Sequence, residues 1–495
     1  MDYSQFLAMK QELGLLVLFL VVFLYDTFMP RSTQRALPVV ATVLMTVLTA
    51  VSFCPCCLGS CSTDVTLFGG MYTSTPVIAA IKNILNVGVV IVLLQSINWA
   101  DSDLMRNRRG EFYELLLVTL FGMYLMISAR HFLLFLIGLE CASLPLAAMV
   151  AFNKSIYESH EAAVKYMLTA VFSSAIFMMG LSFVYGLTGT MYFDGVYTKL
   201  IGEMSPMLVM AVAFVIAGIG FKLSLVPFHL WTADVYQGAP TSVTSYLSVI
   251  SKGATAFAFM CVLAQAFGCV YDKVWEWMLY ALIILTITVG NLFAIRQNNM
   301  KRFLAFSSVS QAGYIMLGII AANAMGTAAM MYYILVYIFS NLAAFGVVQA
   351  VENATGKVNI SDYNGMSKAN PRLAFCMMLA MFSLAGIPPF AGFFSKFFIF
   401  TSAISHGSIA IYVLVLIALI NTIVSLYYYL LVVKSMFITN TDSTPVIARF
   451  DSTFGERLAL WITVGGIILL GIASPVYNFL LELTQKYAAG MFLFN

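Results

Sequence analysis

Long apolar runs recur from one end of this chain to the other, and they constrain its fold more than any other feature. A run of about 18 residues or more with few charges can cross a membrane as a helix. A transmembrane barrel would instead show alternating segments of roughly ten residues, which the sequence lacks. Only 9% of the 495 residues are charged, against about 25% in an ordinary soluble domain. We therefore predict an all-α, polytopic membrane protein.

Helical membrane spans fill almost the whole length of the chain. Counting them predicts about 14 transmembrane helices with connections too short for a soluble catalytic domain. The predicted cores are residues 13–29, 36–58, 74–97, 112–129, 131–151, 162–187, 206–231, 242–268, 274–294, 302–321, 325–350, 372–400, 408–437 and 457–484. Most of the 25 Lys and Arg residues fall in loops after odd-numbered spans. The positive-inside rule then places both termini on the non-cytoplasmic side.

Three short sequence pairs suggest that the chain contains an internal duplication. They are HFLLF at 131–135 with RFLAF at 302–306, KYMLTAVFSS at 165–174 with YYILVYIFSN at 332–341, and LVPFHL at 225–230 with IPPFAG at 387–392. The pairs keep their order and are each five spans apart. Five is an odd number, so the second copy crosses the membrane in the opposite sense, as in many ion transporters.

The duplication divides the single membrane domain into four parts. We expect helices 1–3 in residues 1–100, a first repeat of helices 4–8 in 111–270, a second repeat of helices 9–13 in 271–437, and helix 14 in 456–495. The first pair of sequence matches also aligns Glu140 with Gln311.

Each predicted repeat interrupts its fourth helix with proline. Pro227 lies in span 7, and Gly386, Pro388 and Pro389 lie in span 12. Proline removes a backbone donor and frees a carbonyl group. A single proline in a membrane helix often makes only a kink. Two breaks at matching positions, each near a lysine, favour discontinuous helices that form an ion site.

Ionisable side chains inside the spans point to the chemistry of that site. They are Glu140, Lys82, Lys165, Lys222, Lys252 and Lys396. Each charge costs about 2.5–3.5 kcal/mol at the bilayer centre, so most should face protein or water. Lys82 is the exception, because it lies early in its span and is expected to snorkel to the interface.

The other groups, and His229 in span 7, have competing interpretations. For Lys222, Lys252 and Lys396 the alternative is a side chain that snorkels to the interface. Glu140 is the only acidic residue that we place deep in a predicted span. It could form an ion pair with a lysine, or it could be protonated and donate a hydrogen bond to a neighbouring helix. Lys165 could pair with Glu161, four residues earlier, or lie at the interface. His229 lies on roughly the same helix face as Lys222. It could carry a proton or make a structural hydrogen bond.

Buried lysines that interact with one another suit proton transfer. Burial penalises the charged amine, so a neighbouring charge or water can decide whether it holds its proton. Other chemistries fit poorly, because the sequence has no pair of histidines deep in neighbouring spans for haem and no carboxylate cluster for sodium or calcium. The cysteines of CPCCLGSC (Cys54, Cys56, Cys57 and Cys61) suggest a disulfide or lipid-facing thiols, with a thiol metal site as the alternative.

Several of these stretches together resemble a known family. They are GLECASLPLAAM, EAAVKYMLTAVFSSAIFMMG, GFKLSLVPFHLWTADVYQGAP and LAGIPPFAGFFSKFFIF. They are similar to the antiporter-like subunits of respiratory complex I (NADH:quinone oxidoreductase), and to the N type best, whose mitochondrial counterpart is NADH dehydrogenase subunit 2. The resemblance covers nearly the whole chain and implies 14 helices with two inverted five-helix repeats. Lys396 matches the N type, whereas the M type usually has glutamate there. The lateral helix of the L type is missing.

The resemblance also implies roles for individual residues. Glu140 would tune the proton affinity of Lys222, the central proton carrier. Lys252 would link the two half-channels, and Lys396 would be the terminal lysine. His229 would lie on the connecting polar path. Lys165 would have a secondary role. Lys82 and the CPCCLGSC cysteines fall outside the family pattern.

The expected function is therefore proton translocation within a complex I-type enzyme, a translocase. This chain would hold no cofactor, and flavin, iron–sulfur clusters and quinone would belong to partner subunits. Expected partners are the M-type subunit, small membrane subunits and lipid of a bacterial inner membrane, but not nucleic acid. The alternatives are a subunit of a multisubunit cation/proton antiporter or of a ferredoxin- or hydrogenase-linked complex, a scaffold that does not pump, and an enzyme with its own redox centre.

Overall fold

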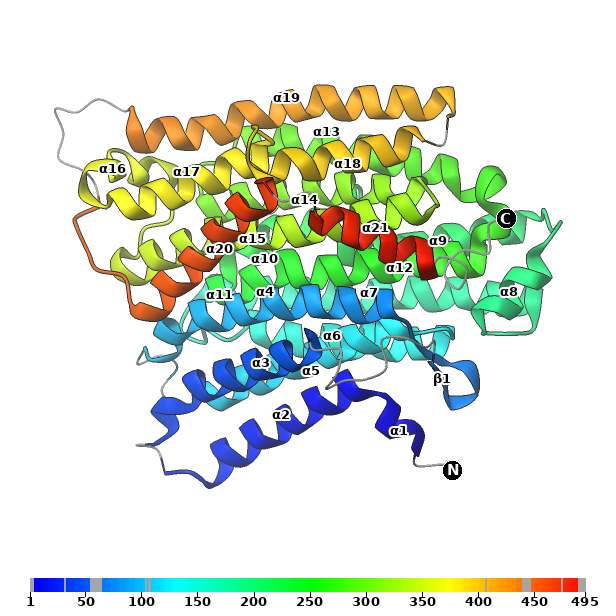
Figure 1. Ribbon diagram of the computed structural model, residues 1–495, viewed down its shortest axis with the longest axis horizontal. Coiled ribbons are helices and arrows are strands. Elements are labelled where there is room, and N and C mark those ends of the chain that lie inside the picture. Colours follow the sequence, from blue (N-terminus) through cyan, green and yellow to red (C-terminus); the bar gives the residue numbers. More distant parts are fainter. Residues whose placement is uncertain are drawn as a thin grey trace.

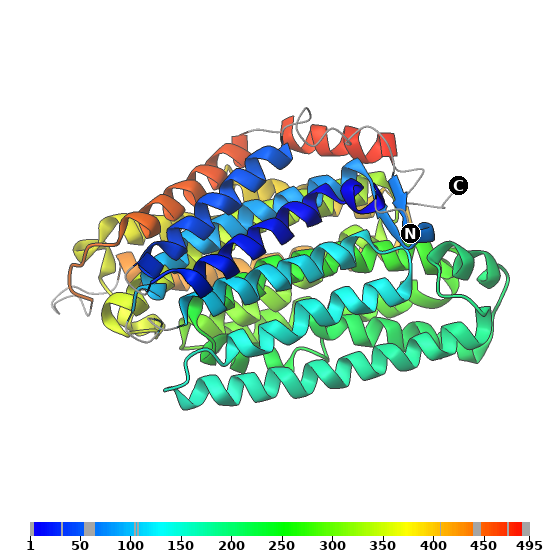
Figure 2. The same cartoon turned by 90° about the horizontal axis from the view of Figure 1, so that it is seen from below.

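The computed structural model describes residues 4–30, 33–53, 65–102, 105, 108–405, 407–438, 447–472 and 475–487. In this part of the chain, helices run alongside one another in a bundle, and the same alignment is seen in the view turned by 90° (Figures 1 and 2). Twelve of the helical stretches are long and apolar enough to cross a membrane. The predicted all-α membrane fold is confirmed.

The elements follow one another as α1 (Ser4–Ala8), α2 (Lys10–Phe28), η1 (Thr33–Ala36), α3 (Leu37–Phe53), β1 (Val65–Leu67), η2 (Phe68–Gly70), β2 (Tyr72–Ser74), α4 (Pro76–Ala100), α5 (Arg109–Ser128), α6 (Phe132–Val150), α7 (Tyr157–Thr188), α8 (Phe193–Leu200), α9 (Pro206–Leu223), α10 (Leu230–Gly238), α11 (Thr241–Tyr246), η3 (Leu247–Ser251), α12 (Lys252–Phe267), η4 (Gly268–Val270), η5 (Tyr271–Trp275), α13 (Glu276–Ile295), α14 (Met300–Ile320), α15 (Ala324–Thr355), η6 (Ile360–Tyr363), α16 (Met366–Ala369), α17 (Pro371–Ala385), α18 (Ala391–Ile404), α19 (Ile409–Phe437), α20 (Phe454–Ile472) and α21 (Pro475–Tyr487). The two strands pair antiparallel, with Thr66 opposite Thr73.

Two of the predicted spans differ in detail from the observed helices. Predicted span 12 is divided between α17 and α18, each shorter than a full crossing. The single helix predicted over 457–484 is wrong, because α20 ends at Ile472 and a separate helix, α21, begins at Pro475. Proline cannot continue a helix without losing a backbone hydrogen bond. The count of 14 spans stays a prediction.

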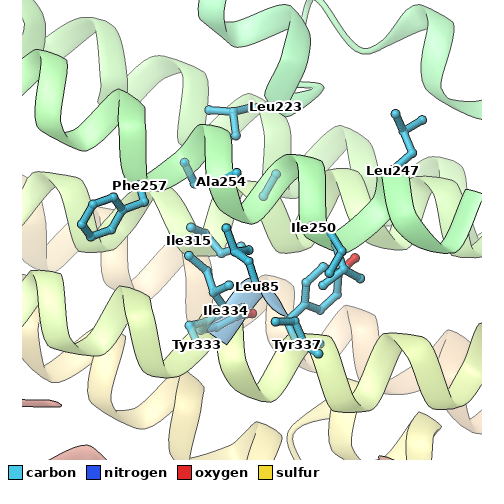
Figure 3. Packing of buried hydrophobic residues seen from close by; sticks show 14 of the residues in the cluster. Leu85, Leu223, Leu247, Ile250, Ala254, Phe257, Ile315, Tyr333, Ile334 and Tyr337 are labelled. Atoms are coloured by element: carbon cyan, nitrogen blue, oxygen red, sulfur yellow. The ribbon is translucent and has the colours of Figure 1, made fainter. Parts of the chain in front are cut away.

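Helices α14 and α15 form the centre of the bundle. The most apolar window of α14 is 100% buried and that of α15 is 89% buried, whereas the window of α2 is only 22% buried. Around this centre, Leu85 of α4, Leu223 of α9 and Ile334 of α15 pack in one continuous apolar cluster (Figure 3). Polar side chains on α14 and α15 are therefore enclosed by protein rather than by lipid.

The two predicted repeats contain the same packing. In the first, α5 packs on α6, and α7 packs on α9 and α10; in the second, α13 packs on α14, and α15 packs on α17 and α18. Helices α7 and α15 each have 32 residues and end at a left-handed glycine, Gly189 or Gly356.

Isolated backbone bridges also recur at matching places in the two halves. One joins His131 to Tyr192, just before α8, and the other joins Asn299 to Asn359, shortly before α16. Helices α8 and α16 lie at opposite ends of the bundle (Figure 1). This is the arrangement that an inverted repeat predicts, although the boundaries given for each copy stay a prediction.

Both predicted helix breaks are present. Helix α9 ends at Leu223 and α10 begins at Leu230, with Ser224 between them in the left-handed region at φ 59°. Helix α17 ends at Ala385 and α18 begins at Ala391, with Gly386 at φ 87°. Cis peptide bonds join Val226 to Pro227 and Pro388 to Pro389.

Side chains satisfy two backbone groups at the first break. The indole nitrogen of Trp231 donates a hydrogen bond of 3.1 Å to the carbonyl of Phe221. The hydroxyl of Thr286 accepts one of 3.0 Å from the amide of Val226. Irregular backbone within a membrane protein needs partners of this kind inside the protein.

Candidate functional site

Lys222, Lys252 and Lys396 are buried within the helix bundle. Their relative exposures are 4%, 2% and 5%. Snorkelling to the interface would leave such side chains exposed at the end of a helix, so the lipid-facing interpretation is wrong for all three. The structure thus places each of the three predicted lysines in a protein environment.

Lys222 lies in the last turn of α9, next to the first break. Its Nζ donates hydrogen bonds to the hydroxyl of Ser143 on α6 and, over 3.3 Å, to the hydroxyl of Tyr166 on α7. The ammonium also lies 6.0 Å from the centre of the Tyr166 ring. Neutral oxygen atoms from two other helices therefore hold this lysine.

Glu140 lies on α6 and is half-buried. The ion pair expected between it and Lys222 is not formed within 4.0 Å. Ser143, three residues further along α6 and on the same helix face, binds the lysine instead. Any influence of Glu140 on Lys222 therefore has to act through space rather than through a direct contact.

Lys252 follows a π-helical turn, η3. Such turns rotate the following side chains relative to a regular helix and are frequent at functional sites. The Nζ of Lys252 donates a hydrogen bond of 2.7 Å to the hydroxyl of Ser308 on α14. It also lies 5.5 Å from the ring centre of Tyr236 on α10.

Lys396 lies on α18, directly after the second break. Its Nζ donates hydrogen bonds of 3.0 Å to the carbonyl groups of Leu384 and Ala385, at the end of α17. The C-terminal end of a helix carries partial negative charge. The break therefore provides this lysine with acceptors that an unbroken helix would use for its own hydrogen bonds.

A small internal cavity of about 10 Å³ adjoins Lys396. This volume holds roughly one water molecule. Its polar lining comes from Gln311, Tyr333, Tyr337, Ser340, Ser383, Ser395 and Lys396. A water molecule in this cavity would lie beside the lysine and could exchange a proton with it.

Helix α14 connects the environments of Lys252 and Lys396. Ser308 binds Lys252, while Gln311, three residues later, lines the cavity of Lys396. Three residues of helix rise by about 4.5 Å. Gln311 also accepts a hydrogen bond from Tyr333 and donates one of 3.2 Å to Tyr429. Polar groups therefore continue from one lysine towards the other.

The predicted duplication relates two of these tyrosines. The matched stretches 165–174 and 332–341 align Tyr166 with Tyr333. Tyr166 binds Lys222, and Tyr333 lines the cavity of Lys396. Each repeat places one tyrosine beside its buried lysine.

His229 lies at the start of α10 and is 6% exposed. Its ring makes no hydrogen bond to another side chain among the described residues. The nearest aromatic contacts are Phe293 and Phe306, at 6.1 and 6.5 Å between ring centres. A role for His229 in proton transfer stays a prediction.

Lys165 lies apart from the three buried lysines. Its side chain is 41% exposed and pairs at 2.6 Å both with Glu161, as predicted, and with Asp234 of α10. Asp234 also pairs at 2.7 Å with Arg302 of α14. This network joins three helices near the surface.

Lys82 was expected to snorkel, and this expectation is wrong. Its side chain is fully buried and forms an ion pair of 2.5 Å with Glu12 of α2, which is 2% exposed. The hydroxyl of Tyr72 donates a hydrogen bond of 2.9 Å to the same carboxylate. Helix α2 and the hairpin of β1 and β2 cover this lysine. The sequence of its own span contains no information about these contacts.

Glu12 was missed because the first span was predicted to begin one residue after it. Helix α2 begins at Lys10, and Glu12 in its first turn is buried, so an acidic side chain other than Glu140 also lies inside the bundle. Two features of the sequence could have predicted this pair. A lysine inside a span requires a partner, and Glu12 directly precedes an apolar run. The cysteines Cys54, Cys56, Cys57 and Cys61 lie outside the described residues. Among the residues that are described, no group of three or more His, Cys, Asp or Glu side chains could hold a metal ion.

Comparisons with known proteins agree in pointing to one family. Residues 129–422 match the family model described as "NADH:quinone oxidoreductase/Mrp antiporter, TM". NADH-quinone oxidoreductase subunit N of Phocaeicola vulgatus is 51% identical over 481 residues, which cover 97% of this chain and 99% of that protein.

Two solved structures share the fold. A chain of respiratory complex I from Thermus thermophilus, determined with bound Aureothin, aligns with a TM-score of 0.78 and 28% identity, over 95% of this chain and 98% of the other. A chain of the Mrp complex from Dietzia sp. aligns with a TM-score of 0.83 over 98% of this chain and 97% of the other. Its identity is 19%, so this second likeness concerns the fold alone.

Proposed function

The chain belongs to the family of antiporter-like membrane subunits of NADH:quinone oxidoreductase and Mrp antiporters, and from this premise we propose that it translocates protons as subunit N of complex I. Two proteins named NADH-quinone oxidoreductase subunit N are 51% and 49% identical to this chain over 97% of its length. This similarity supports the assignment to complex I rather than to a free-standing antiporter. Electron transfer from NADH to quinone would take place in partner subunits.

The observation that carries the proposal is the row of buried lysines bound by neutral oxygen atoms. Burial favours the uncharged amine, whereas hydroxyl and carbonyl acceptors favour the ammonium. The two protonation states are thereby brought closer in free energy. A change of charge or hydration nearby can then load or unload a proton.

The order of groups suggests a route. Protons would pass from Lys222 to Lys252 and then, by way of Ser308 and Gln311 on α14, to Lys396. Glu140 would act on Lys222 through space, and its state would depend on the neighbouring subunit. His229 and Lys165 would serve as accessory groups.

The setting of the subunit is also part of the proposal. It would lie in a bacterial inner membrane with both termini on the non-cytoplasmic side. Its neighbours would be the M-type subunit and small membrane subunits of the membrane arm. Flavin, iron–sulfur clusters and quinone would be bound by other subunits.

The test uses the assembled complex in proteoliposomes, with Lys222→Met or Lys396→Met in this chain. We expect fewer protons pumped per NADH oxidised, with the complex still assembled. Lys199→Met, at an exposed position of α8, is the matched control and should change nothing. An unchanged proton-to-electron ratio in both lysine variants would show that the chain is a scaffold, and the proposal would be wrong.

A further inference from the structure

A cavity separate from the lysine row lies at the end of the bundle that carries α16. It has a volume of about 630 Å³ and is formed by the end of α16, the start of α17, the loop that precedes α20, and the first turns of α20. Pockets that bind small molecules typically measure about 300–1,000 Å³. The route proposed above uses none of the residues that line it.

Four basic side chains line this cavity, those of Lys368, Arg372, Arg449 and Arg457. Arg457 pairs with Asp451 at 3.4 Å. Within the described residues, Lys368, Arg372 and Arg449 have no acidic partner within 4.0 Å. Four cations and one carboxylate, Asp451, thus line the cavity. This excess of positive charge complements an anion such as a phosphate, which arginine binds through two parallel hydrogen bonds.

The loop segment 448–450, which contains Arg449, is held in place by hydrogen bonds. The side chain of Asn370, which is 6% exposed, donates a hydrogen bond of 3.1 Å to the carbonyl of Ala448. The same side chain accepts one of 3.2 Å from the amide of Phe450. The loop is thus anchored to the start of α17, which fixes the backbone on either side of Arg449.

The other side of the cavity is apolar and continues along the membrane helices. Phe375 of α17 is 50% exposed and Trp461 of α20 is 74% exposed. Both line the cavity together with Leu460 and Val464. Tryptophan is common at the boundary between headgroups and acyl chains. A ligand that matches this lining has an anionic head and an apolar tail.

We propose that this cavity binds an anionic phospholipid. The phosphate would bind Arg372, Arg449 and Lys368, and the acyl chains would lie against Phe375 and Trp461. Basic pockets between membrane helices bind lipid headgroups in this way. The apolar wall argues for a lipid rather than for free phosphate, which would use the cations alone. The orientation proposed above assigns the lipid to the cytoplasmic leaflet, but its binding does not depend on proton translocation.

The test is native mass spectrometry of the purified complex, with phosphatidylglycerol or phosphatidylcholine added at matched concentrations. We expect selective binding of phosphatidylglycerol to the wild type. In the double variant Arg372→Gln/Arg449→Gln the apparent affinity should fall roughly 30-fold. Trp461→Ala should weaken binding of the lipid without removing its preference for the anionic headgroup.

Three comparisons make the outcome decisive. Arg296→Gln removes an exposed cation elsewhere in the chain and should leave binding unchanged, while Arg372→Lys/Arg449→Lys should retain most of it. Equal binding of both lipids, or wild-type binding by the double glutamine variant, would overturn the proposal. Competition by millimolar inorganic phosphate as strong as that by the lipid would identify a site for soluble anions, which would also overturn it.

Discussion

At the scale of single residues, the three buried lysines share one kind of environment. Each ammonium is bound by hydroxyl or carbonyl oxygen atoms and lies 5.3 to 6.0 Å from the ring centre of a tyrosine. Carboxylates are not their direct partners. A salt bridge would fix the charged state, whereas neutral acceptors stabilise it only partly. This difference separates the lysine row from Lys82, which has a carboxylate partner.

Removing the acceptor of Lys252 tests this distinction. Ser308→Ala deletes its hydrogen bond of 2.7 Å. A hydrogen bond to a charged group contributes about 1.5–3 kcal/mol, so we expect proton-coupled turnover to slow roughly tenfold or more. The measurement is proton uptake by proteoliposomes during NADH oxidation. Ser402→Ala is the control, because this buried serine bonds only to its own helix at Ile399; equal rates in the two variants would contradict the prediction.

The pair of Lys82 and Glu12 should contribute to stability instead. Lys82→Met leaves a buried carboxylate without its partner, which typically costs about 3–5 kcal/mol. We expect a lower melting temperature and a lower yield of assembled complex. The double variant Lys82→Met/Glu12→Leu should recover most of the loss, since an apolar pair of similar volume is often tolerated. If the double variant is no more stable than Lys82→Met, the ion pair is not the cause.

At the scale of secondary structure elements, the helix breaks create the lysine sites. The break between α17 and α18 exposes the carbonyl groups that bind Lys396. The π-helical turn η3 directly precedes Lys252, and Lys222 ends α9. Each of the three lysines therefore lies at an interruption of regular helix. An interruption leaves backbone groups and space that a continuous helix would consume.

Gly386 tests the importance of the second break. It has φ 87°, and an added Cβ would lie 3.1 Å from Cδ of Lys396. Gly386→Ala should therefore strain the backbone by about 1–2 kcal/mol and displace the lysine, which lowers the proton-to-electron ratio. Gly356→Ala carries the same backbone cost at φ 69° with no atom within 4 Å. The prediction fails if both variants pump alike.

At the scale of the whole molecule, two related halves run in opposite senses through one bundle. Their equivalent bridges, before α8 and before α16, lie at opposite ends (Figure 1). The α16 end also carries most of the loops that are rich in lysine and arginine. An asymmetry of this kind sets the orientation of a membrane protein during insertion.

Labelling of intact cells can measure this orientation. With native cysteines replaced, Lys199→Cys in α8 should react with a membrane-impermeant maleimide added outside the inner membrane. Arg296→Cys, after α13, should react only after the membrane is permeabilised. Both residues are exposed, so accessibility alone does not separate them. The reverse pattern would invert the proposed topology.

Much of the fold and part of the site were predictable from the sequence. The spans, the breaks at Pro227 and Pro389, and the burial of Lys222, Lys252 and Lys396 follow from hydrophobic length, proline chemistry and the cost of a charge in lipid. These properties belong to short stretches of chain. The interruption at Pro475 and the pairing of Glu12 were missed because boundaries are the weakest part of such predictions.

The sequence by itself determined that this chain forms membrane helices with interrupted spans and internal lysines, because each of these properties is local. Only the tertiary structure decided which atoms the lysines touch: Ser143 rather than Glu140 binds Lys222, α14 joins two lysine sites, and Lys82 lies inside with Glu12. Such contacts depend on the rotation and packing of helices distant in the sequence, and no single span contains that information.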